Sequence, residues 1–121
     1  MGAQVNPETD KRRWELLREF YAASEGAKVN FAPMIELLKW VSAQPFAAEI
    51  YGNTSLDALC ISRKPGYHPK DPFFSCDMRL DGLMHFTLWD KVGSQRQATR
   101  VPPDWANETF AEFVRLLSAG R

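Results

Sequence analysis

The sequence predicts an α+β fold in which two N-terminal helices precede an antiparallel meander of four or five strands, and one C-terminal helix follows it. Apolar residues recur with a period of about 3.6 before Pro45, with a period of about 2 after it, and with the helical period again near the end. Turn-forming residues separate the alternating stretches. Because the helices flank the strands instead of alternating with them, we expect them to pack on one face of the sheet and leave the other open.

The composition is that of one ordinary globular domain. We expect residues 1–121 to form that domain, with residues 1–6 as a disordered tail. The 15 basic and 15 acidic residues cancel, so the molecule as a whole has no field that would hold it on nucleic acid or on an anionic membrane. Cys60 and Cys76 lie in apolar stretches and the N-terminus lacks the apolar segment of a secretory signal, so we expect reduced, buried thiols and a cytoplasmic location without membrane contact.

The first helix is expected over residues 6–26, with Asn6 as its cap and Gly26 as its stop signal. The second is expected over residues 31–43 with Asn30 as its cap, because proline is tolerated only in a first turn and Pro33 occupies that place. The buried stripe of the first helix should contain Trp14, Leu17 and Tyr21, widened by Leu16 and Phe20; that of the second should contain Met34, Leu37, Leu38 and Val41.

The strands are expected from Phe46 onward. The stretch "FAAEIY" predicts a strand, "GNTS" a turn, and "LDALCISR" a second strand that is apolar on both faces and therefore central. A proline-rich loop precedes strands over residues 73–79 and 83–89, and residues 96–101 form a polar edge strand. The last helix should be capped by Asn107 or Asp104 and should bury Phe110, Phe113, Val114 and Leu117.

The hairpin "DPFFSCDMRLDGLMHFTLWD" has two possible registers. A two-residue turn at Asp81-Gly82 would put His85 on the same face as Cys76. A three-residue loop over residues 80–82 with a left-handed glycine would instead separate polar from apolar side chains completely, and we favour it. Its apolar face pairs Met78 with Met84, Cys76 with Phe86 and Phe74 with Leu88; its outward face pairs Phe73 with Trp89, Ser75 with Thr87, Asp77 with His85 and Arg79 with Leu83.

Two chemical hypotheses for this hairpin are weak. Ser75, Asp77 and His85 are the residue types of a hydrolase triad, but on a flat sheet face the serine lies diagonal to the histidine and no oxyanion donors are evident. A zinc site formed by Cys60, His68, Cys76 and His85 would lack the closely spaced ligand pairs that zinc sites use. We therefore expect no catalytic residues, no metal ligands and no cofactor, and interpret Asp77 and His85 as a cross-strand pair on a solvated face.

Binding of a macromolecular partner is the favoured function, as in an inhibitor, an immunity protein or an adaptor. Aromatic and charged side chains gather on the outward face, as they do at interface hot spots. The loop over residues 63–72 is bracketed by prolines and carries basic residues, so it would lose little conformational entropy on binding. The expected contact residues are Tyr67, His68, Lys70, Phe73, Asp77, His85 and Trp89.

Two alternatives come from other functional classes, and whether the protein is a monomer or a homodimer stays open. One is an enzyme or small-ligand protein whose pocket lies between helices and sheet, with His85 or Asp57 as the acid-base group. The other is RNA or single-stranded DNA binding through the basic segments 63–70 and 91–100, which would depend steeply on salt.

Overall fold

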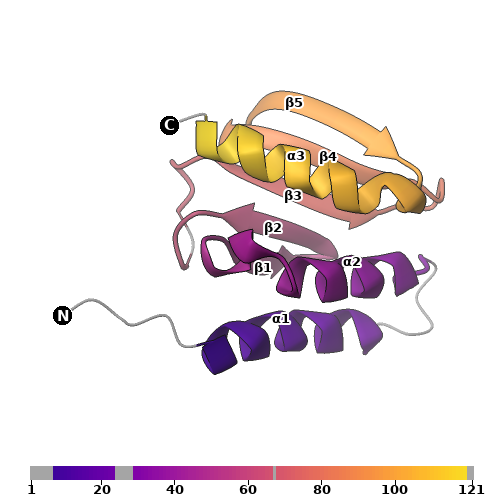
Figure 1. Ribbon diagram of the computed structural model, residues 1–121. Coiled ribbons are helices and arrows are strands. Elements are labelled where there is room, and N and C mark those ends of the chain that lie inside the picture. Colours follow the sequence, from indigo (N-terminus) through magenta and orange to yellow (C-terminus); the bar gives the residue numbers. More distant parts are fainter. Residues whose placement is uncertain (1–6, 24–28, 67, 120–121) are drawn as a thin grey trace.

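The computed structural model describes residues 7–23, 29–66 and 68–119 of the chain (Figure 1). The expected tail 1–6, the cap Asn6 and the stop signal Gly26 lie outside these residues. The elements, in chain order, are α1 (Pro7–Ala22), α2 (Ala32–Ser42), η1 (Pro45–Ala48), β1 (Tyr51–Ser55), β2 (Ala58–Ser62), β3 (Phe73–Met78), β4 (Met84–Lys91), β5 (Ser94–Val101), η2 (Pro103–Trp105) and α3 (Ala106–Ala119).

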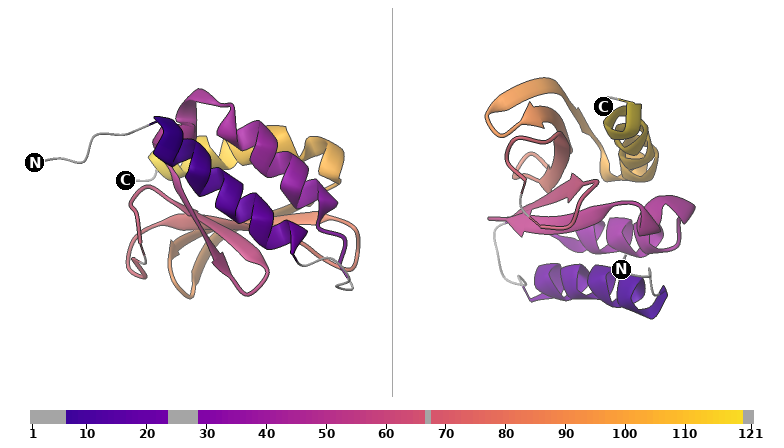
Figure 2. Two further views of the ribbon diagram at one scale, coloured as in Figure 1. Left: turned by 90° about the horizontal axis from the view of Figure 1, so that it is seen from below. Right: turned by 90° about the vertical axis from the view of Figure 1, so that its left-hand side faces the viewer.

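The strands form a five-stranded sheet in the order β1-β2-β3-β4-β5, and each strand is antiparallel to the next. The three helices lie together on one side of this sheet (Figure 2). α1 contacts β1, α2 contacts β3, and α3 contacts β3 and β4. The predicted α+β architecture is confirmed, including the helices on one face, and no helix of the described residues covers the opposite face.

α1 packs on the sheet with a narrower apolar stripe than expected. Trp14 and Tyr21 are each only 1% exposed, whereas Leu16 is 52% and Phe20 38% exposed. The Tyr21 hydroxyl donates a hydrogen bond to the carbonyl oxygen of Asp57 at 3.0 Å, which ties the end of α1 to the β1–β2 turn. The helix thus rests on the sheet along one narrow line, and the two flanking side chains face away from it.

α2 (Ala32–Ser42) follows the prediction except in its capping residue: Phe31 occupies the N-cap position without a side-chain hydrogen bond, and Asn30 lies one residue before it. The Asn30 side-chain oxygen accepts a hydrogen bond from the backbone N–H of Ala32 at 3.0 Å, so it satisfies one of the unpaired donors of the first turn. Pro33 lies in that turn, where its missing N–H has no consequence. The four residues of the expected stripe are buried: Met34, Leu37, Leu38 and Val41.

The segment between α2 and β2 differs from the prediction. Pro45 begins the short helix η1, "GNTS" lies within β1 instead of forming a turn, and Leu56 and Asp57 make the turn. The packing of α1 on β1 accounts for the glycine in this strand: a Cβ atom on Gly52 would lie 2.8 Å from Leu17 Cδ1, so helix and strand approach closely here. Leu56 occupies the turn with φ of 54° and is 93% exposed.

The hairpin has the favoured three-residue register. β3 and β4 pair Met78 with Met84, Cys76 with Phe86, Phe74 with Leu88, Asp77 with His85, Ser75 with Thr87 and Phe73 with Trp89. Gly82 has φ of +78°, and its N–H donates to the Arg79 carbonyl at 3.0 Å. Segregation of polar from apolar side chains was therefore a sufficient guide to the register.

The C-terminal part follows the prediction except at the start of its helix. β5 forms the edge strand, with register shifts opposite Trp89. α3 begins at Ala106 directly after η2, so Asp104 lies in η2 and Asn107 lies inside α3, and neither occupies the expected capping position. The buried residues of α3 include the four expected: Phe110, Phe113, Val114 and Leu117.

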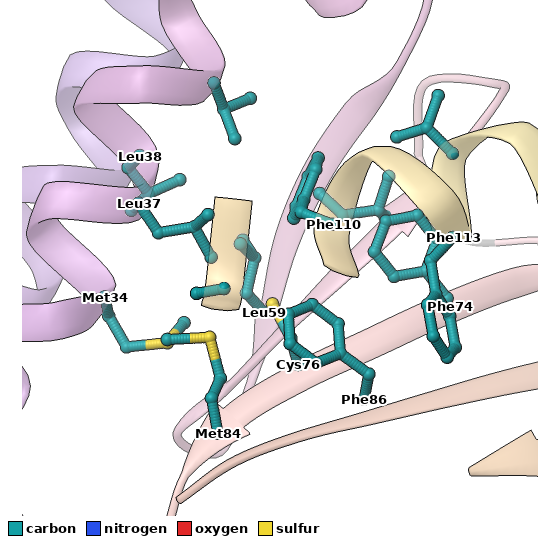
Figure 3. Packing of buried hydrophobic residues seen from close by; sticks show 14 of the residues in the cluster. Met34, Leu37, Leu38, Leu59, Phe74, Cys76, Met84, Phe86, Phe110 and Phe113 are labelled. Carbon is teal, nitrogen blue, oxygen red and sulfur yellow. The ribbon is translucent and has the colours of Figure 1, made fainter. Parts of the chain in front are cut away.

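The core fills the space between the helices and the sheet. Met34, Leu37 and Leu38 of α2 meet Leu59, Phe74, Cys76, Met84 and Phe86 of the sheet, and Phe110 and Phe113 of α3 close the other side (Figure 3). Every buried residue of the described segments is apolar. Trp14 belongs to this core, Trp40 packs against it, and Trp105 is 60% exposed.

Candidate functional site

The candidate site lies on the outer face, the sheet face turned away from the helices. Side chains alternate along the strands, so the partners of the buried residues point outward and are half-buried: Ala58, Cys60 and Ser62 of β2, Phe73, Ser75 and Asp77 of β3, and His85, Thr87 and Trp89 of β4. Cys60 lies beside Ser75, and Ser75 beside Thr87. Small side chains thus run across the middle of the face.

Larger groups surround this low centre, which creates a hollow of about 610 Å³ that is open to solvent. We call it the outer hollow. Its volume falls within the range of about 300–1,000 Å³ that is usual for ligand pockets. It is lined by Asn53, Thr54, Ser55, Ala58, Cys60, Ser62, Gly66, His68, Phe73, Ser75, Trp89, Val92 and Gly93.

Two aromatic rings form one wall of the outer hollow. Phe73 and Trp89 are stacked, with ring centroids 6.0 Å apart and an angle of 11° between the ring planes. The Trp89 Nε1–H donates a hydrogen bond to Ser75 Oγ at 3.2 Å, which fixes the indole against the neighbouring strand. Such a pair contributes about 0.5–1.5 kcal/mol beyond the area it buries, so this wall is rigid.

The loop over residues 63–72 forms the end wall. The Ser62 hydroxyl donates to the Lys64 carbonyl at 2.8 Å, and the Asn53 side chain donates to the Gly66 carbonyl at 3.5 Å. The Val92 N–H donates to the Pro69 carbonyl at 2.9 Å, which joins the loop to the β4–β5 turn. The loop is therefore held over the end of the sheet at three places.

Among the residues that the structure describes, no Asp, Glu, Lys or Arg lines the outer hollow. Exposed basic residues border the lining residues along the chain instead, and we call them the basic rim: Arg63, Lys64, Lys70 and Lys91. Lys64 is paired with Asp71 at 3.1 Å, whereas the other three have no carboxylate within ion-pair distance among the described residues. The site thus combines a neutral floor with a cationic edge.

Cys60 is a half-buried thiol in the floor of the outer hollow. Burial raises its pKa, and the negative charge of Asp77 raises it further, so the thiol stays protonated at neutral pH. A protonated thiol is a poor nucleophile and behaves as a small apolar group. Cys76 is fully buried on the helix side of the sheet, so the two thiols lie on opposite faces.

At the far end of the outer face, charged side chains pair locally. Asp77 binds the Arg79 guanidinium at 2.9 Å, and the His85 ring binds the Asp81 carboxylate at 2.8 Å. The expected Asp77–His85 pair is correct for the backbone register but wrong for the side chains, because the loop carboxylate reaches the imidazole instead. Hydrogen bonds from the Leu83 N–H and from His85 lower the pKa of Asp81.

The structure divides the seven predicted contact residues into groups. His68, Phe73 and Trp89 line the outer hollow. Asp77 and His85 lie further along the same face in ion pairs of their own, and Lys70 belongs to the basic rim. Tyr67 lies outside the described residues.

The part of the site that β1 and β2 contribute was not predicted from the sequence, because residues 52–55 have the composition of a turn and Cys60 was expected to be a buried core thiol. A useful indication was present in β2, whose outward residues Ala58 and Cys60 are as apolar as its inward ones. In a strand with one solvated face, apolar residues on that face indicate a contact surface.

The geometry gives little support to the other chemistries. Ser75 bonds to Trp89 and His85 to Asp81, so the candidate triad is not assembled. Among the described residues, no three His, Cys, Asp or Glu side chains come together as a metal site would require, and no helix is both long and apolar enough to span a membrane. The space between helices and sheet is filled by the core.

No protein-family model matches the chain, and comparison with curated proteins and with solved structures produced no match. Any functional argument must therefore start from the site itself.

Proposed function

We propose that this protein binds a protein partner through its outer face and the 63–72 loop, and that it acts by that binding and not by catalysis. The observation that carries the proposal is the outer hollow, an uncharged depression whose wall is the Phe73–Trp89 stack. Protein interfaces have an apolar centre, rich in aromatic residues, inside a polar rim. The outer face has the same arrangement, with charged side chains at both ends.

The chemistry of the lining residues supports binding over catalysis. The raised pKa of Cys60 works against a nucleophilic role, and the His68 ring nitrogen Nε2 lies 2.8 Å from the Pro65 carbonyl oxygen, within its own loop. The free thiols of Cys60 and Cys76 agree with action in the reducing cytoplasm, which is part of the proposal.

Capture of partners from a lysate of the source cells tests this proposal, with binding read by mass spectrometry. The double variant Asp77→Arg/Trp89→Ala removes the aromatic wall and reverses a charge on the outer face. Its matched control is Asp104→Arg/Trp105→Ala, which makes the same two changes at exposed positions of η2.

We expect the wild type and the control to retain a partner that the outer-face variant loses. Thermal unfolding of each variant shows that the fold is intact. If the outer-face variant retains every specific partner of the wild type, the outer face is not the interface and the proposal is wrong.

A further inference from the structure

We infer that the partner, under the function proposed above, presents one large apolar or aromatic side chain to the outer hollow and acidic residues next to it. The inference combines the neutral hollow with the cationic edge beside it. Each feature by itself is compatible with many ligands, but together they specify a segment of defined chemistry.

The floor and walls favour an apolar occupant because several of their polar groups are already bonded within the protein. The Trp89 Nε1–H is bonded to Ser75, the Ser62 hydroxyl to the Lys64 carbonyl, and the Asn53 amide to the Gly66 carbonyl. Backbone groups in the floor are paired within the sheet. A polar ligand would lose its hydration and find few free partners here, which costs free energy, whereas an apolar side chain loses nothing.

The basic rim favours carboxylates next to that side chain. Arg63 and Lys64 directly follow Ser62, and Lys91 directly precedes Val92, so the cationic residues border lining residues of the hollow. Lys70 follows Pro69, whose carbonyl is bonded to Val92. Attraction between these cations and carboxylates of a bound segment acts over a screening distance of about 8 Å at physiological salt.

A single-stranded nucleic acid, which would also offer a flat ring and negative charge, fits less well. Phe73 and Trp89 stack on each other, so one ring face of each is already occupied. A nucleic-acid groove is basic along the path of the strand, whereas here Asp71 pairs with one rim lysine and Asp77 and Asp81 lie at the far end of the face. An extended acidic peptide needs positive charge only beside its anchor.

Titration of the isotope-labelled protein with short capped peptides tests the inference, with the amide resonances of Ser62, Ser75 and Gly93 as the readout. The probes are Glu-Asp-Trp-Asp-Glu, the neutral Gly-Ser-Trp-Ser-Gly, and Glu-Asp-Ala-Asp-Glu without the anchor. We expect the acidic tryptophan peptide to bind about threefold or more tightly than the neutral one at low salt. Loss of the anchor should weaken binding about tenfold or more.

Two variants test separately whether peptide binding depends on the outer hollow and whether the preference for acidic peptides depends on the basic rim. Cys60→Phe, which fills the floor of the hollow, should abolish binding of all three peptides. Lys70→Glu/Lys91→Glu should remove the preference for the acidic peptide over the neutral one, while Lys39→Glu, an exposed lysine on α2, should leave it unchanged.

The results separate this inference from the proposed function. Equal binding of the acidic and neutral tryptophan peptides overturns the acidic character of the partner. Tighter binding of an oligothymidylate at the same resonances overturns the inference in favour of nucleic acid. If no peptide shifts these resonances while the lysate experiment still yields a partner that the outer-face variant loses, the inference fails and the proposed function stands.

Discussion

Replacing Gly52 with alanine should destabilise the protein, although alanine is ordinarily the better residue inside a strand. The new Cβ atom would lie 2.8 Å from Leu17 Cδ1 and 3.2 Å from Trp14 Cζ3, both closer than a normal van der Waals contact. Overpacking of this kind costs about 1–3 kcal/mol. Alanine restricts the unfolded chain and so returns about 0.4–1 kcal/mol. Because the Leu17 side chain is only half-buried and has room to move, we expect a net loss of about 1 kcal/mol, or about 4 °C in Tm.

A double-mutant cycle in urea shows whether this contact is the cause. In a Leu17→Ala background the 2.8 Å contact is absent, so Gly52→Ala should then be close to neutral, which corresponds to a coupling energy of about 1 kcal/mol. Equal destabilisation in both backgrounds, or stabilisation by Gly52→Ala alone, would refute the argument that α1 requires glycine at this place in β1.

Three further predictions concern the turns and the thiols. Leu56→Gly should stabilise the protein by up to about 1 kcal/mol in thermal or urea unfolding, because φ of 54° strains leucine; unchanged or lower stability contradicts this. The pKa of Asp81 is lowered in the folded state, so its stabilising contribution is present above its unfolded pKa of about 3.9 and is lost as pH falls through the folded value. Asp81→Asn should therefore cost stability at pH 7, and the difference in stability between wild type and variant should shrink near pH 3. A difference in stability that does not change with pH is evidence against this. A thiol reagent should modify Cys60 slowly while the protein is folded, and should modify Cys76 only after unfolding. Mass spectrometry of the modified peptides measures both rates. Equal modification rates would contradict the placement of the two thiols on opposite faces.

The parts of the fold that were predictable from sequence are those where one physical signal dominates. In α2 the proline of the first turn and the apolar stripe agree, and the structure has both, while Asn30 accepts a hydrogen bond from the Ala32 N–H from the position before the N-cap. In the β3–β4 hairpin only one register places all apolar side chains on one face, and a one-residue slip would have exposed Phe74, Cys76 and Phe86.

The region between α2 and β2 was mispredicted because its local and tertiary signals disagree. The letters "GNTS" have the composition of a turn, and leucine is an unusual residue for a left-handed position. The glycine is in fact needed because Trp14 and Leu17, some 35 residues earlier in the chain, press on the strand. No local pattern contains that contact, so a local analysis assigns the glycine to the wrong role.

The candidate site was predicted in part for a related reason. Phe73 and Trp89 were recognisable because the hairpin register places them outward together, as the structure confirms. Apolar residues on both faces of β2 predicted a central strand, buried on each side, and β2 does pair with a strand on both edges. Helices cover only its Leu59 and Ile61 side, however, so nothing within the described fold covers Ala58 and Cys60 beyond the hollow they line. An apolar strand face that the described part of the chain leaves open reaches full burial only when another molecule covers it, and this is the physical reason for proposing the outer hollow as the interface.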